Sequence, residues 1–104
     1  MLENRLVLTG VVREKPQIRF TPAGIPIASF HLQHHSIQQE AGHPRKALCT
    51  LPVLFAGESV QERMQQLEAG SRVRVTGFIS RANHRHGEYR LVLHGQQIET
   101  IAIE

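Results

Sequence analysis

The chain has 104 residues, 40% of them hydrophobic and 20% charged, which is enough for one compact domain and too little for two. Its 12 lysines and arginines outnumber its 9 acidic residues, all of them glutamates, and the net charge of +3 favours a polyanionic partner. Its single cysteine, Cys49, excludes an internal disulfide and any zinc site that needs several cysteines.

The beginning of the chain and its hydropathy predict neither export nor membrane insertion. The first residues lack the basic and apolar regions of a signal peptide, and no apolar run reaches the roughly 18 residues of a membrane span. We therefore expect a cytoplasmic protein made of a single domain, residues 1–104, in which Cys49 packs as a small core side chain.

The first third of the chain alternates strand patterns with turn residues. Residues 4–13 predict a strand in which Gly10 allows a bend or a close backbone approach. Residues 17–35 predict a short strand, a tight Thr-Pro-Ala-Gly turn at residues 21–24, and a second strand. On this second strand, alternation places three residues in the core and three on the outer face: Ala28, Phe30 and Leu32, against His31, Gln33 and His35.

A loop and a disturbed strand are expected next. Residues 36–44 are polar and predict a loop, whereas residues 45–57 predict a strand. Pro52 lies inside that strand and cannot donate a ladder hydrogen bond, so it indicates a sheet edge or a bulge.

A short helix follows this strand. Val60, Met64 and Leu67 recur at helical spacing, and Ser59 with Glu62 forms the S-x-x-E pattern of a capping box. The glycine at position 70 is expected to end the helix.

The last third of the chain predicts a hairpin. In residues 71–80, Val73 and Val75 point inward between outward arginines, and residues 89–95 predict the partner strand, with Leu91 and Leu93 on one face. Residues 81–88 connect the two strands, and residues 98–104 predict a further short strand or a tail. Among the aromatic residues, Phe30 and Phe78 are assigned to the core.

The order of these elements predicts an all-β fold with one small helix between the third and fourth barrel strands. With glycines inside the first and fourth strands, it matches a five-stranded Greek-key OB barrel. The first strand is apolar on both faces, with Leu6 and Leu8 on one and Val7 and Val11 on the other. We therefore expect a homodimer that buries the spare face.

The placement of the basic residues predicts a nucleic-acid site. OB barrels bind oligonucleotides through the second and third strands and the loops that join strands one to two and four to five. The candidate contacts near those places are Arg19, His35, Arg45, Lys46, Arg81, Arg85 and Arg90. Because the chain has few aromatic rings for stacking, we expect phosphate contacts to dominate and the affinity to fall steeply with salt.

Residues 80–90, SRANHRHGEYR, admit two other interpretations. His84 and His86 suggest a metal site, but the intervening Arg85 repels a cation and no carboxylate or C-x-x-C pair is nearby. A solvated hairpin turn at Gly87 also fits the pattern. We expect no metal and no cofactor.

No nucleophile, base or metal-binding cluster is assembled in the sequence, so we expect no enzymatic activity. Three glutamates on the predicted helix, at positions 58, 62 and 68, fit a solvated face. His34 falls on the core face with Phe30 and is expected to be a buried histidine whose hydrogen bonds are satisfied.

Four longer stretches resemble one family. The PriB family, also called primosomal replication protein N, is similar to this chain in NRLVLTGVV (residues 4–12) and in TPAGIPIASFHLQHHSIQQEAG (residues 21–42). LEAGSRVRVTGFIS (residues 67–80) and LVLHGQQIE (residues 91–99) extend the resemblance over nearly the whole chain. The G-S-x-V-x-V-x-G piece is shared more widely with single-stranded DNA-binding proteins.

The resemblance implies an OB-fold homodimer that binds single-stranded DNA and acts in the replication-restart primosome. Such a protein stabilises the PriA helicase on DNA and helps to recruit DnaT for loading of the replicative helicase. By position, the resemblance implies basic DNA contacts at Arg19, Arg85 and Arg90, and it includes the region of Arg45.

Three residues depart from the family pattern. Leu48 stands where relatives can carry a tryptophan that stacks on bases, His35 stands where an arginine is expected, and Asn83 replaces a basic residue. The first two changes imply a weaker affinity, or one that rises below neutral pH through His35.

Two other functions remain as alternatives. An RNA-binding OB module would use the same groove, because only 2′-hydroxyl contacts distinguish RNA from DNA. A protein adaptor would use the barrel for protein partners, with incidental nucleic-acid binding.

Overall fold

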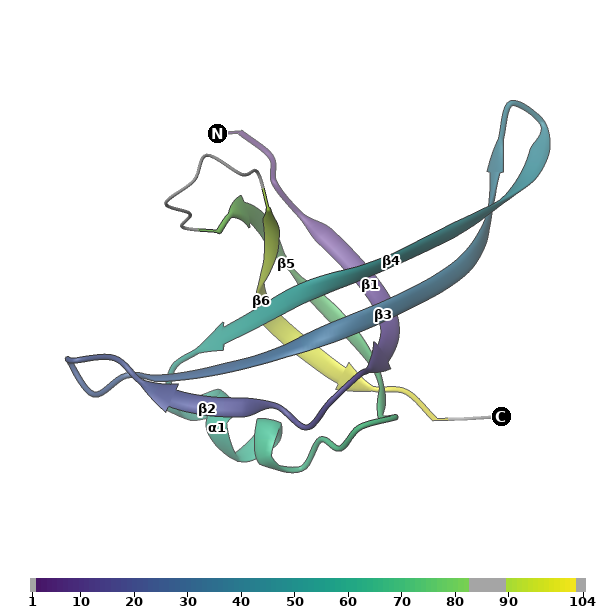
Figure 1. The fold of residues 1–104 in the computed structure, drawn as a ribbon. Helices are drawn as coiled ribbons and strands as arrows, with labels where there is room; N and C mark the ends of the chain where they lie inside the picture. The colour runs from purple at the N-terminus through teal and green to yellow at the C-terminus, as the bar shows by residue number, and fades with distance from the viewer. Residues whose placement is uncertain (1, 83–89, 103–104) are drawn as a thin grey trace.

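The computed structural model describes residues 2–82 and 90–102, which form six strands and one short helix (Figure 1). The strands are β1 (Leu6–Val12), β2 (Gln17–Phe20), β3 (Pro26–Glu40), β4 (His43–Ala56), β5 (Arg72–Arg81) and β6 (Leu91–Thr100). The helix α1 (Glu58–Gln65) lies between β4 and β5 in the chain.

Five of the strands close a barrel, and the short β2 extends its wall beside β3. The pairs β1–β5, β5–β6 and β3–β4 are antiparallel, whereas β4 and β6 meet in a short parallel pairing. The barrel closes where Val11 and Val12 of β1 pair with Gln33 and Leu32 of β3. This connectivity is that of the Greek-key OB barrel, so the predicted fold is confirmed.

Two glycines within strands lie where neighbouring backbones approach closely. A Cβ atom on Gly10 would overlap the carbonyl oxygen of Gln33, and one on Gly77 would overlap that of His94. Any side chain at these positions would push the strands apart. The close approach expected at Gly10 is therefore confirmed, and Gly77 lies at a register shift in the β5–β6 pairing.

The turn between β2 and β3 has the geometry that its sequence predicts. The N–H of Gly24 donates to the carbonyl of Thr21 at 2.8 Å, and the N–H of Thr21 donates to the carbonyl of Ile25 at 2.9 Å. Gly24 has φ of +84°, which a residue with a side chain rarely adopts. The tight reversal at residues 21–24 is confirmed.

One apolar cluster fills the barrel and confirms most of the predicted core. It consists of Val12, Ala28, Phe30, Leu32, Val53, Phe55, Met64, Leu67, Val73, Val75, Leu93 and Ile98. The rings of Phe30 and Phe55 stack with centroids 6.5 Å apart. Met64 and Leu67 bring the chain around α1 into this cluster, and Figure 1 shows α1 at one end of the barrel.

The start of α1 differs from the prediction. Gly57, with φ of 113°, is the N-cap residue, and no side chain makes a capping hydrogen bond there. Ser59 therefore lies one residue inside the helix, and the predicted capping box of Ser59 and Glu62 is wrong.

The end of α1 is also earlier than predicted. The helix ends at Gln65, and Gly70 lies in the turn beyond it, where its N–H donates to the carbonyl of Val12 at 2.8 Å. Lys15 reaches this end from the β1–β2 connection. Its Nζ donates to the carbonyl of Gln65 at 3.0 Å and to that of Leu67 at 3.2 Å.

β3 and β4 extend beyond the barrel as a two-stranded arm, which consists of residues 34–49 (Figure 1). The loop predicted at residues 36–44 is wrong, because the β3–β4 register runs without interruption to the pair Glu40–His43. Only Ala41 and Gly42 form the turn, both at positive φ, as a two-residue hairpin turn requires. The polar pattern reflects solvent on both faces of the arm. Pro52 precedes the residues at which β4 meets β6, which agrees with an edge position.

Three residues assigned to the core lie elsewhere. Cys49 is exposed, because it lies on the arm. Phe78 is 37% exposed on the outer face of β5, where its ring stacks on His94 at 4.9 Å between centroids. His34 is half-buried rather than buried, although both ring nitrogens have hydrogen-bond partners, one of them the carbonyl of Thr9 at 2.6 Å.

The C-terminal hairpin is confirmed with two corrections. β5 and β6 pair in antiparallel fashion up to Arg81 and Leu91, while residues 83–89 lie outside the described part of the chain. Residues 98–100 belong to β6 and form no separate strand. Leu91 is exposed whereas the adjacent Val92 and Leu93 are both buried, so the predicted alternation fails at the start of β6. Within the described residues, no helix is long and apolar enough to span a membrane.

Candidate nucleic-acid interface

The outer faces of β3 and β4 form one continuous strip. Paired residues of an antiparallel sheet lie side by side, and successive pairs alternate between the two faces. The outer strip, as it is called below, consists of the pairs Ser29–Leu54, His31–Pro52, Gln33–Thr50, His35–Leu48 and Ile37–Lys46. Phe30, Leu32 and Val53 lie between these pairs and are buried, which defines the outward direction. None of the ten strip residues is acidic.

Three of the predicted contacts lie on this face of the sheet. His35 and Lys46 belong to the outer strip, and both are exposed. Arg19 lies on β2, paired with Ile27, and so shares the face that Ser29 defines. The structure therefore distributes Arg19, His35 and Lys46 along one outward surface.

Arg45 lies on the other face of the arm. It pairs with Gln38, one position away from the Ile37–Lys46 pair, and so points to the opposite side. Its Nη1 lies 3.2 Å from Oε1 of Glu40, and both side chains are mostly exposed. Part of its charge is therefore opposed by a carboxylate.

Two of the remaining predicted contacts, Arg81 and Arg90, belong to the β5–β6 hairpin. Arg81 ends β5 and Arg90 precedes β6; both are exposed, and the carbonyl of Arg90 accepts a hydrogen bond from the N–H of Ala82 at 2.8 Å. Figure 1 shows this end of the hairpin on the opposite side of the view from the tip of the arm. Arg85 lies outside the described residues.

The pair His35–Leu48 borders a groove of about 620 Å³ between the arm, β1 and the end of β6. Gln33 and Thr50 continue its wall along the outer strip, and Arg72 contributes a basic side chain. Leu48 is 68% exposed, which is unusual for leucine. An apolar side chain here offers a contact surface for a base, although a smaller one than a ring.

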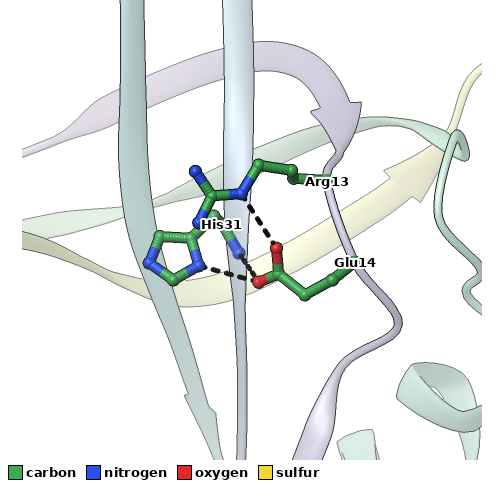
Figure 2. Close-up of polar contacts among 3 residues, drawn as sticks. All are labelled: Arg13, Glu14 and His31. Carbon is green, nitrogen blue, oxygen red and sulfur yellow. Dashed lines mark hydrogen bonds and ion pairs between the residues drawn. The ribbon is translucent and has the colours of Figure 1, made fainter.

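At the His31–Pro52 pair of the outer strip, His31 forms a hydrogen-bonded cluster with Glu14 and Arg13 (Figure 2). Oε1 of Glu14 accepts a hydrogen bond from the backbone N–H of His31 at 2.8 Å and lies 2.7 Å from its Nδ1. Oε2 accepts a hydrogen bond from Nε of Arg13 at 3.2 Å. Burial alone raises the pKa of Glu14, but the hydrogen bonds from His31 and Arg13 outweigh it and hold the pKa below its ordinary value.

A smaller hollow of about 330 Å³ lies at this cluster. Gln17 of β2, Ser29 of β3 and Leu54 of β4 also line it. The alternation of β3 placed His31 on the outer face, but sequence reasoning missed Glu14 and Gln17. Glu14 carries no local signal, because its partner is 17 residues away.

The described residues contain no group of three or more His, Cys, Asp or Glu side chains that would hold a metal ion. His84 and His86, the pair that suggested a metal, lie outside these residues. In the same part of the chain, no polar or charged residue is fully buried.

Comparison with known proteins places the chain in a family. A family model described as "another single-strand binding protein family" matches residues 4–97. The replication restart protein PriB of Photorhabdus laumondii is 48% identical over 101 residues, which cover 97% of this chain and 96% of that protein. The structure of PriB from Ralstonia solanacearum matches with a TM-score of 0.80 at 28% identity, over 95% of this chain and 98% of that chain.

A more distant structure shares the fold. The single-stranded DNA-binding protein of Plasmodium falciparum, solved in complex with single-stranded DNA, has a TM-score of 0.81 at 14% identity, covering 98% of this chain and 97% of that chain. The chain belongs to the single-strand binding protein family and, within it, to the PriB replication restart proteins.

Proposed function

We propose that this protein binds single-stranded DNA along the outer strip and acts in replication restart, as a homodimer without catalytic activity of its own. The observation that carries the proposal is the placement of Arg19, His35 and Lys46 on one outward face, along a strip without acidic residues. Membership of the PriB proteins supports the role in restart.

The chemistry of the strip suits a flexible single strand. Basic side chains spaced along it neutralise phosphates and release counterions, while Leu48 and the groove beside it offer apolar surface to bases. Arg81 and Arg90 of the β5–β6 hairpin would extend the phosphate path, as would Arg85, which lies between them in the sequence. Arg45 is expected to contribute less to DNA binding, because it faces the opposite side of the arm beside Glu40.

Within that role, the protein would stabilise the PriA helicase on DNA and help to recruit DnaT, in the cytoplasm. Family membership supports this part of the proposal. A helicase assay with purified PriA on a forked substrate tests it: the wild-type chain should stimulate unwinding. Stimulation that survives a variant unable to bind DNA would favour the adaptor function instead.

The neighbouring residues Lys46 and Arg45 provide a matched test of the outer strip. Fluorescence anisotropy with labelled oligothymidine, at several salt concentrations, would compare Lys46→Ala with Arg45→Ala. We expect Lys46→Ala to weaken binding about 3- to 10-fold at low salt and to reduce the salt slope by about one. Arg45→Ala should have a clearly smaller effect, since the two residues differ in the face they occupy.

The outcomes separate the candidate functions. A larger loss with Arg45→Ala would contradict the outer strip as the binding surface. Tighter binding to a matched RNA than to DNA would replace the DNA function with RNA binding, and undetectable binding of single strands at low salt would reject both.

A further inference from the structure

The hollow beside His31 combines apolar walls with a few directed polar groups. Pro52 and Leu54 of β4 line it, as do the polar side chains of Gln17 and Ser29. Its volume of about 330 Å³ lies at the lower end of the range of small-molecule pockets, so it suits one planar ring. It opens on the outer strip, between Arg19 and Lys46 along the sheet.

The contact between Glu14 and His31 determines which ring nitrogen carries the hydrogen. A carboxylate only accepts hydrogen bonds, and Oε1 lies 2.7 Å from Nδ1, so Nδ1 must be the donor. In the neutral imidazole, Nε2 is then an acceptor. Figure 2 shows Nε2 on the side of the ring away from Glu14.

The carboxylate of Glu14 also fixes the groups around the His31 ring. It accepts the backbone N–H of His31 at 2.8 Å, so the ring and its strand are anchored to one group. It also accepts a hydrogen bond from Nε of Arg13 at 3.2 Å, which orients the planar guanidinium next to the hollow. A guanidinium plane held in this way can stack on a base.

We propose that this hollow is a nucleobase subsite, in which Nε2 of His31 accepts a hydrogen bond from an N–H of one DNA base. Glu14 is a positioning residue that sets the tautomer of His31 and does not touch the base. The subsite rests on the proposed function, because it requires a single strand on the outer strip.

A phosphate is a poor occupant of the same hollow. Its oxygens only accept hydrogen bonds, so beside a neutral imidazole they would face the acceptor Nε2, with the negative charge of Glu14 behind it. A base edge offers N–H donors, and its flat face can pack on Pro52 and Leu54. The strand can therefore keep its phosphates on Arg19 and Lys46 while one base turns inward.

The salt dependence of binding distinguishes a base contact from a phosphate contact. At about pH 8, we expect His31→Leu to weaken binding of a mixed-sequence oligonucleotide about 5- to 20-fold at every salt concentration. The slope of affinity against salt should not change, because no phosphate contact is lost. An abasic deoxyribose-phosphate strand should bind the wild type and His31→Leu equally.

The positioning role of Glu14 and a purely electrostatic role predict opposite changes in DNA affinity when the carboxylate is removed. Removal of a carboxylate from a DNA-binding face should by itself strengthen binding, whereas loss of the correct tautomer should weaken it. We expect Glu14→Ala to bind more weakly than wild type, and ¹⁵N NMR to show the Nδ1–H tautomer of His31 only in the wild type. Glu99→Ala removes a paired, exposed carboxylate on β6 and should leave the His31 tautomer unchanged.

Three results would overturn the subsite: unchanged affinity of His31→Leu, a salt slope reduced by about one in that variant, or tighter binding by Glu14→Ala. If His31→Leu does not fold, the ¹⁵N NMR signal of Nε2 in wild-type His31 tests the subsite, because this signal must shift when the oligonucleotide is added. Failure of the wild type to bind any single strand would reject the proposed function itself. Normal wild-type binding that His31→Leu leaves intact would reject only the subsite.

Discussion

Glu14 ties the β1–β2 connection to β3 through its contacts with His31, and these contacts depend on its charge. Its pKa is lower in the folded state than the ordinary value, so folding favours the carboxylate, and its stabilising effect is present above the ordinary carboxyl pKa. The effect is lost as the pH falls through the folded-state pKa. We expect Glu14→Gln to be less stable than wild type at neutral pH and the difference to close below roughly pH 4. Urea denaturation at a series of pH values measures this, and a constant difference would contradict it.

At the scale of elements, Lys15 joins the β1–β2 connection to the end of α1. Its Nζ donates to the carbonyls of Gln65 and Leu67 and lies 3.0 Å from Oε1 of Glu68. A cation at a helix C-terminus satisfies free carbonyls and opposes the helix dipole, so Lys15→Met should lower the free energy of unfolding by about 0.5–1 kcal/mol. Urea denaturation measures the change. Glu68→Gln removes only the exposed ion pair and should cost less; an equal cost would assign the effect to that pair.

For the whole molecule, the outer side of β1 is the surface that the proposed homodimer would bury. Leu6 and Leu8 pack against the core, whereas Val7 is 42% exposed. We expect sedimentation to give the wild type an apparent mass of twice the 11.7 kDa of one chain. Val7→Arg should shift the apparent mass toward that of the monomer, because a buried unpaired charge is costly. Ile25→Arg, at a 46% exposed residue of the β2–β3 turn, is the matched control. Equal sedimentation of all three proteins would contradict this dimer surface.

Local patterns predicted much of the fold because the relevant interactions are local. The turn at residues 21–24 depends on a glycine at positive φ, and the alternation in β3 depends only on the pleat of a strand. One group of errors concerns how far the barrel extends. Cys49 was assigned to the core because the pattern of β4 does not reveal that β3 and β4 leave the barrel as an arm.

The candidate site was predicted in composition rather than in arrangement. Alternation correctly placed His31 and His35 on the outer face of β3, while the faces occupied by Lys46 and Arg45 depend on the register with β3. Two adjacent basic residues on an exposed strand point to opposite sides, and no property of either residue indicates which one shares the face of the outer strip.

By itself, the sequence determined the barrel, its small helix and the family, because periodicity, turn residues and motifs are properties of neighbouring positions. Only the tertiary structure decided that Leu48 lies opposite His35 and that Glu14 holds His31. These pairs join residues that are distant along the chain. Their proximity follows from strand register and barrel closure, which are set by the packing of the whole core.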